Sequence, residues 1–332
     1  MTTDAPAVGL LDGAGDLLTI ASDVWQVDVL PGTGAALAAG RVRTDDGVWR
    51  DLLRPTHPRG AGNPEKTSSW PMVPWANRIS GGLLRFGGRS WQLQRNGADL
   101  SAIHGATRNV AWPVVERTAG AVALELDTRA LVGVNFPWHF VARVEYRLDG
   151  AELAVSTSLR NVADEAFPAG FGHHPYFRRA LVPVGATPPT RAPGPVLEIP
   201  ARRGWRMHDG LVRGPAREPR AVADFRTPRE VGGVVLDDVL TDLEPGAPVR
   251  LRYPELTAEL RLDATYTHLV VYSPRGRSYL AVEPQTQVTD AYALFAEGAA
   301  DTGTVVLAPG EELAGRFSIT VAPGGIAPFT QS

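Results

Sequence analysis

The feature that most constrains the fold of this sequence is an alternation of apolar and polar side chains with a period of two. Residues 140–148 alternate in this way, and a second alternating run covers residues 153–159. Successive side chains of a β-strand point to opposite faces, so each run predicts a half-buried strand. The intervening Asp149-Gly150 predicts a tight hairpin turn, because both central residues of such a turn need positive φ.

Short runs of this kind, separated by turn residues, cover most of the chain. The 35 glycines and 28 prolines are typical of a protein with many turns between short strands. Residues 83–86 and 90–94 flank Gly87-Gly88 and predict a second hairpin, while residues 290–295 predict one or two turns of helix. The further expected strands are residues 24–30, 121–127, 258–263, 269–272, 304–307 and 316–321.

These runs predict an all-β protein, folded as a large antiparallel β-sandwich with its site on one concave face. The Pro- and Gly-rich stretch Val182–Pro195 has the composition of a linker, but strand-like runs lie on both sides of it. We therefore expect a long surface loop there, and a single domain over residues 1–332.

The composition excludes several classes of function. The 33 Lys and Arg residues against 36 Asp and Glu give a net charge of −3, and no basic face is indicated for a nucleic acid. The absence of cysteine excludes disulfides and thiolate catalysis. No apolar run approaches the roughly 18 residues that a membrane-spanning helix needs. Met1–Leu11 contains no basic residue, unlike a signal peptide, so we expect a cytoplasmic protein without nucleic-acid or membrane partners.

The stretch Gly172–Phe177 places two adjacent histidines before a proline and two aromatic residues. Adjacent side chains on an extended segment point in opposite directions, so His173 and His174 are not expected to act together. Pro175 restricts the backbone of His174 to extended conformations and helps to fix its ring. An imidazole with an ordinary pKa of about 6.5 suits a general acid at neutral pH. A buried, purely structural histidine is the alternative.

Glu283 lies at the end of a strand-like run, and Pro284-Gln285-Thr286 is expected to end that strand abruptly at a rim. A glutamate with an ordinary pKa of about 4.3 is ionised at neutral pH and can accept a proton. A solvated glutamate at a strand end is the alternative.

Three further stretches contribute polar side chains in mostly apolar settings. Arg78 offers several fixed donors for hydroxyl or carboxylate groups, and His104 lies between an isoleucine and a glycine. Asp237 and Asp238 are adjacent, and ordinary turn acids are the alternative reading of both. The spacing of His, Asp and Glu supports no metal site, so neither a metal nor another cofactor is expected. The remaining histidines are expected to be structural, namely His57, His139, His208 and His268.

In their serial order, these stretches resemble the aldose 1-epimerase (galactose mutarotase) family over residues 16–318. Gly-x-His-Pro-Tyr-Phe and Glu-Pro-Gln-Thr are the most specific of them. The resemblance implies a β-supersandwich and the cofactor-free interconversion of the α and β anomers of an aldose. It implies that Glu283 is the general base and His174 the general acid. Arg78, His104 and Asp237 would bind the sugar, with Asp238 as the alternative to Asp237.

Departures from the galactose-type pattern leave the identity of the sugar open. Val73–Ala76 stands where many members have a Gly-Arg pair, and Asp238 replaces a histidine. The expected partner is a small-molecule free aldose, bound by a monomer or homodimer. The alternatives are a glycosidase using Glu283 and Asp237, a non-catalytic sugar-binding sandwich, and a hexose-6-phosphate 1-epimerase. The last needs a cationic cluster for the phosphate, with Arg85, Arg89, Arg178 and Arg179 as scattered candidates.

Overall fold

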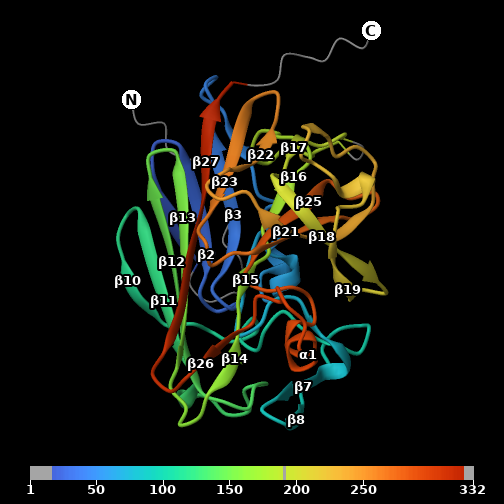
Figure 1. Ribbon diagram of the computed structural model, residues 1–332. Coiled ribbons are helices and arrows are strands. Elements are labelled where there is room, and N and C mark those ends of the chain that lie inside the picture. The colour runs from blue at the N-terminus through green and yellow to red at the C-terminus, as the bar shows by residue number, and fades with distance from the viewer. Residues whose placement is uncertain (1–16, 190–191, 325–332) are drawn as a thin grey trace.

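The structure is a computed structural model that describes residues 17–189 and 192–324, and its regular structure is almost entirely β (Figure 1). Within those ranges the strands form two large antiparallel sheets, a four-stranded sheet and three two-stranded ribbons. The predicted all-β fold class, a large antiparallel sandwich, is confirmed. The segment Met1–Leu11, from which we argued against a signal peptide, lies outside the described residues.

The larger of the two main sheets has nine strands in the described chain, all paired antiparallel. In Figure 1 its β10 to β13 and β27 stand together on one side of the molecule. In order across the sheet, the strands are β10 (Val114–Arg117), β11 (Ala121–Asp127), β12 (Phe140–Asp149), β13 (Glu152–Asn161), β27 (Glu312–Pro323), β23 (Leu256–Leu262), β22 (Val249–Arg252), β17 (Val196–Glu198) and β20 (Arg229–Glu230).

The hairpin of β12 and β13 confirms the strongest of the strand predictions, but its turn differs from the predicted one. Residues 150–151 make the turn, and Gly150 has a φ of 53° while Ala151 does not enter the positive region. Glycine at the first central position is the pattern of a type II′ turn, whereas Asp149-Gly150 predicted type I′. Gly87-Gly88, with φ of 56° and 75°, has the two positive values that type I′ requires.

The second large sheet has eight strands in the described residues, seven of them along its main path, and it carries the candidate site. In order, they are β19 (Leu211–Arg217), β18 (Ala201–His208), β21 (Leu236–Leu243), β24 (His268–Ser273), β25 (Tyr279–Gln285), β15 (Gly172–His173) and β5 (Pro71–Met72), with β16 (Tyr176–Arg178) paired to β25 beside β15.

The two large sheets pack face to face, and the apolar core lies between them. Alternation along β24 sends Leu269 and Val271 into this core, while Val270 and Tyr272 share the other face with their partners Glu283 and Ala281. The side chain of His173 on β15 also lies in this core. Its Nε2 lies 2.7 Å from Oγ1 of Thr157 on β13, and its ring packs against Phe317 of β27.

The remaining elements close the ends and sides of the sandwich. Helix α1 (Ala291–Ala296) confirms the short helix predicted for residues 290–295. Apart from residues 190–191, Val182–Pro195 contains no strand or helix, as expected of a loop. No helix of the described chain is long and apolar enough to cross a membrane. The other strands are β1 (Leu18–Ala21), β2 (Trp25–Leu30), β3 (Ala36–Arg43) and β4 (Trp49–Asp51), with the ribbons β6 (Arg78–Ile79) with β9 (Ala102–Ile103), β7 (Leu83–Phe86) with β8 (Arg89–Gln92), and β14 (Phe167–Ala169) with β26 (Val305–Leu307). Short 3-10 turns occur at Pro58–Gly60, Pro64–Lys66, Ser80–Gly82, Thr128–Ala130 and Ala221–Ala223.

The four-stranded sheet of β1 to β4 contains a buried group of charges. Arg41 on β3 donates from Nη1 to Oδ2 of Asp28 at 2.7 Å, and its Nε lies 3.6 Å from Oδ1 of Asp51. All three residues are only 3% exposed. Removing one partner of a buried ion pair leaves the other charge without compensation, which is more costly than the pair itself is stabilising.

We therefore expect Arg41→Met to lower the free energy of unfolding by about 3–5 kcal/mol. Arg43→Met is the matched control, because Arg43 is an exposed arginine at the end of the same strand. The control should change stability by less than about 0.5 kcal/mol. Urea unfolding of both variants measures the difference, and equal midpoints would contradict the assignment of a stabilising role to Arg41.

Candidate active site

The candidate site is organised by strand β25 and the segment that runs beside it, residues 170–178. Gly172 pairs with Gln285, and Tyr176 pairs with Ala281. A step of two residues from either pair brings His174 opposite Glu283. Directly opposite residues of antiparallel strands point to the same face, so this register alone predicts that the two side chains meet.

Glu283 and His174 are in contact, and both are buried. Nε2 of His174 lies 3.2 Å from Oε1 of Glu283, while Nε2 of Gln285 donates to Oε2 of Glu283 at 3.0 Å. Glu283 is 2% exposed and His174 6%. Strand β25 ends at Gln285, within residues 284–286 as predicted, but Glu283 is buried and does not lie at a rim. Pro284 pairs with Leu269 of β24, because the N–H that a proline lacks faces away from that strand.

Of the two adjacent aspartates, the structure brings Asp237 to this face. Asp237 pairs with Tyr272, which in turn pairs with Ala281, two residues from Glu283. Asp238 points the other way, and its carboxylate accepts two hydrogen bonds from Arg220, at 2.8 and 2.6 Å. The alternation of a strand thus separates a candidate site residue from a structural ion pair.

Arg78 and His104 reach the site together, since the short strands β6 and β9 pair Arg78 with Ile103. The backbone N–H of His104 donates to the carbonyl of Asn77 at 2.8 Å. The His104 ring lies 5.3 Å from that of His174, edge to face. Arg78 donates from Nε to Asp99 at 2.8 Å, which fixes its guanidinium. All five predicted site residues therefore gather at one place.

A glycine is required beside His104 for a steric reason. Gly105 has a φ of 76°, and a Cβ added to it would lie 2.3 Å from the carbonyl oxygen of Val73. Any other residue would push the loop of His104 and Gly105 away from the backbone of Val73. This explains the His-Gly pair that the sequence analysis singled out without a structural reason.

The tryptophan ring of Trp70 is a site component that the sequence analysis missed. It stacks on His174, with ring centroids 4.4 Å apart and planes at 23°, and it meets the edge of His104 at 5.6 Å. The backbone N–H of His174 donates to the Trp70 carbonyl at 3.2 Å. Trp70 is fully buried. No local motif marks it, because its role depends on strand β5 lying beside β15.

Two arginines outside the predicted set also lie near the imidazoles. The guanidinium of Arg54 lies over the rings of Tyr176 and Tyr279, at 3.8 and 4.6 Å from their centroids. Its Nη2 donates to the carbonyls of residues 65 and 67. Arg108 is ion-paired with Glu65 at 2.9 Å. The four arginines named as phosphate candidates form no comparable group near His174 in the described chain.

Burial opposes charge on both members of the central pair. Desolvation raises the pKa of Glu283 well above its ordinary value, and the nearby carboxylate of Asp237 raises it further. The hydrogen bond from Gln285 and the positive charge of Arg78 act the other way and lower the pKa of Glu283. Desolvation lowers the pKa of His174 to about 3, and the charge of Arg54 adds to this. The pKa of His104 is also lowered, by burial first and then by His174.

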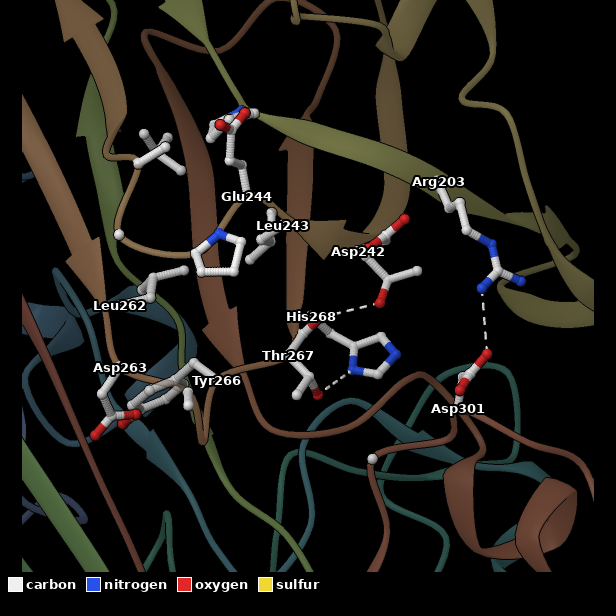
Figure 2. Close-up of a pocket in the computed structure, with 18 residues that line it drawn as sticks. Arg203, Asp242, Leu243, Glu244, Leu262, Asp263, Tyr266, Thr267, His268 and Asp301 are labelled. Carbon is white, nitrogen blue, oxygen red and sulfur yellow. Dashed lines mark hydrogen bonds and ion pairs between the residues drawn. The ribbon is translucent and has the colours of Figure 1, made fainter.

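A separate cavity of about 640 Å³ opens at the end of the same sheet (Figure 2). His268 lines it, with Nδ1 2.8 Å from Oγ1 of Thr267, and Arg203 reaches across to Asp301 at 3.2 Å. Of the described residues that line this cavity, none belongs to the predicted site set. His268, which lines the cavity, pairs with Gln285, which neighbours Glu283 on β25, so the cavity lies next to the candidate site along these strands.

The sequence comparison with known families gives one match that covers most of the chain. The model of the family described as aldose 1-epimerase matches residues 17–320. The chain belongs to the aldose 1-epimerase family. The match spans both large sheets and every residue of the candidate site, which confirms the resemblance inferred from the motifs.

Two uncharacterized Escherichia coli proteins are similar in sequence. YphB is 34% identical over 136 residues, 40% of this chain but only 44% of YphB. YihR is 33% identical over 226 residues, 67% of this chain and 70% of YihR.

Among solved structures, the fold is similar to that of a galactose mutarotase-like protein from Clostridium acetobutylicum. That match has a TM-score of 0.79 at 18% identity, over 93% of this chain and 95% of that one. A putative aldose 1-epimerase from Escherichia coli gives a TM-score of 0.76 at 21% identity, over 93% and 99%. At these identities the likeness shows the shared fold.

The opposite orientations of the two aspartates predict different effects on the Glu283 carboxyl. Asp237→Asn removes a like charge, so ionised Glu283 is less opposed and its pKa should fall. Asp238→Asn should leave the pKa of Glu283 unchanged, because that carboxylate faces Arg220. Infrared titration of the protonated carboxyl band of labelled glutamate measures both. Equal effects of the two substitutions would contradict the assignment of Asp237 to the site.

Proposed function

We propose that this protein is an aldose 1-epimerase, an isomerase that interconverts the α and β anomers of a free aldose. The observation that carries the proposal is the 3.2 Å contact between His174 Nε2 and Glu283 Oε1. The anomeric carbon of a cyclic sugar bears both the hydroxyl that loses a proton and the ring oxygen that gains one. A base and an acid that act on two oxygens of one carbon must be close neighbours.

The reaction follows from this arrangement. Glu283 takes the proton of the anomeric hydroxyl, and the oxygen left behind forms a carbonyl double bond with C1. The C1–O5 bond breaks, and its electron pair takes a proton from protonated His174. Rotation about C1–C2 by half a turn presents the other carbonyl face. Reclosure returns a proton to His174 and takes one from Glu283, so the enzyme is restored.

The protonation states of the pair agree with this cycle. The reactive form has an ionised Glu283 and a protonated His174, while burial favours neutral forms of both. These two arrangements contain the same number of protons and differ only in which residue holds one of them. Coupled groups titrate as a pair, so activity should fall where the pair gains a second proton and where it loses its only one.

The other predicted residues have binding roles in this proposal. Arg78, His104 and Asp237 offer donors and an acceptor on the same face as Glu283, which suits the remaining hydroxyls of the sugar during rotation. A glycosidase is less well supported, because the nearest ionisable partner of Glu283 is an imidazole and that chemistry relies on two carboxyl groups.

Polarimetry of freshly dissolved α-D-glucose and α-D-galactose tests the proposal. Glu283→Gln keeps the shape of the side chain but removes the proton acceptor, and His174→Asn removes the titrating donor. Because general acid–base assistance is worth about 10²–10⁴-fold, each change should lower kcat by that factor with a small change in sugar affinity. The two losses should be less than additive, since the steps need both groups.

Arg78→Ala is the contrasting variant, because a residue that holds hydroxyls should raise KM at least as much as it lowers kcat. If Glu283→Gln folds normally and equilibrates anomers at nearly the wild-type rate, the proposed epimerase is wrong.

A second candidate is the epimerisation of an anionic aldose such as a hexose 6-phosphate, and the position of Arg54 is the observation that favours it. This arginine lies near His174, and among the described residues no carboxylate lies within ion-pair distance of it. An anionic group on the sugar would supply that partner. For a neutral sugar, Arg54 has only its carbonyl and ring contacts.

The ratio of kcat/KM for glucose and galactose to that for their 6-phosphates separates the two candidates. We expect the neutral sugars to be preferred, because the Arg54 side chain is already held by two backbone carbonyls. A preference of about 100-fold for the phosphates, the value of one or two charge-assisted hydrogen bonds, would favour the second candidate. Arg54→Met should then remove that preference, with Arg43→Met as the surface control.

A further inference from the structure

Gln285 is buried beside Glu283, and its contacts set it apart from an ordinary core glutamine. Its side chain is 0% exposed. Its amide Nε2 donates to Oε2 of Glu283 at 3.0 Å, and Oε1 has no hydrogen-bond partner among the described residues. In most buried amides both the N–H donors and the oxygen acceptor have hydrogen-bond partners. In Gln285 the hydrogen bond to the Glu283 carboxylate is the one that the side chain makes among the described residues.

The strand opposite is shaped to admit Gln285. Gly172 stands across from it in the register, and a Cβ added to Gly172 would lie 2.9 Å from Cγ of Gln285. Contacts of this length essentially never occur, so a larger residue at 172 would displace the glutamine. The φ of Gly172 is not in the left-handed region, so the reason for glycine here is space: a Cβ would also lie 2.9 Å from the carbonyl oxygen of Pro284.

The same register provides an internal comparison. Two residues further along, Gln287 stands opposite Gly170, and a Cβ at Gly170 would lie 1.5 Å from Oε1 of Gln287. Gln287 is also buried, at 1% exposure, but it lies near Tyr292 of α1 rather than Glu283. Each of the two glutamines is thus buried opposite a glycine, but of the two it is Gln285 that donates a hydrogen bond to the Glu283 carboxylate.

We propose that Gln285 is a positioning residue that favours the ionised form of the Glu283 carboxylate and holds its Oε1 toward His174. With Oε2 fixed by the amide, the other oxygen is directed at the imidazole. The N–H donor bonds more strongly to an ionised carboxylate than to a neutral acid. The proposal rests on the proposed function, in which Glu283 must be ionised to accept a proton.

Several other groups face Glu283 and set the background against which Gln285 acts. Asp237 and burial favour the protonated acid, while Arg78 and Gln285 favour the carboxylate. Two phenols and the imidazole complete the surroundings. The facing groups are Asp237 on β21, Tyr272 on β24, Tyr176 on β16, Arg78 on β6 and His174.

The test compares Gln285→Met with Gln287→Met through the pH dependence of kcat/KM for a free aldose. Without the amide donor, the protonated acid is relatively more stable, so the alkaline limb, where the pair loses its only proton from Glu283, should move about one pH unit toward higher pH. kcat at the optimum should fall roughly 10-fold, as expected for the loss of one charge-assisted hydrogen bond. Gln287→Met should leave the position of the limb unchanged.

Gln285→Glu provides a second variant of nearly identical shape, in case methionine prevents folding. A second carboxyl group beside Glu283 opposes its ionisation, so the alkaline limb should move further toward higher pH than with methionine. In a Glu283→Gln background, Gln285→Met should cause no additional loss, because the group it positions is already absent.

The possible failures are distinguishable. An alkaline limb unmoved in both Gln285 variants, or moved equally by Gln287→Met, would overturn the role of Gln285 while Glu283→Gln still abolishes turnover. A Glu283→Gln variant with near wild-type activity would overturn the proposed function itself.

Discussion

The candidate site depends above all on the antiparallel register between β25 and residues 170–178. In that register His174 faces Glu283, and Gly172 faces Gln285. The alternate residues go to the core, where His173 contacts Thr157. Because the side-chain period of a strand is two, a slip of one residue would exchange these faces and place an unmatched carboxylate in the apolar core. The packing of the sandwich and the geometry of the site are therefore fixed by the same pairing.

Fixing the pair in this way requires the removal of two ionisable groups from water, which opposes ionisation of both. The surrounding groups counter this in different ways. Gln285 donates to the carboxylate, and the face of Trp70 lies against the imidazole, where an aromatic ring stabilises a cation. Asp237 acts in the opposite direction by raising the pKa of Glu283. Gln285 and Trp70 thus offset part of the effect of burial, which favours the neutral forms of both residues.

Local sequence patterns were sufficient to predict much of the fold, and the order of the motifs along the chain was sufficient to indicate the family. The alternation of residues 140–148 and the turn residues after it predicted a hairpin that the structure contains. Long-range pairing could not be predicted, because strand propensity does not say which strands are neighbours. Trp70 and Arg54 were missed for this reason, since their sequence surroundings carry no signal. The expected rim position of Glu283 was wrong, because Pro284 leaves the pairing of β25 with β24 intact and Glu283 stays buried between them and the neighbouring segment.

The choice between Asp237 and Asp238 also depends on long-range strand pairing, which the sequence alone does not reveal and the structure does. The two residues are indistinguishable by composition, yet Asp238 accepts both hydrogen bonds of Arg220 and Asp237 is left to act on Glu283. A register fixed two strands away, through Tyr272 and Ala281, decides between them. Substrate binding that places a hydroxyl against Asp237 would weaken its repulsion of Glu283 and so favour the ionised base. In this arrangement the sugar itself would help to move the proton from Glu283 to His174, at the moment when the reaction needs it there.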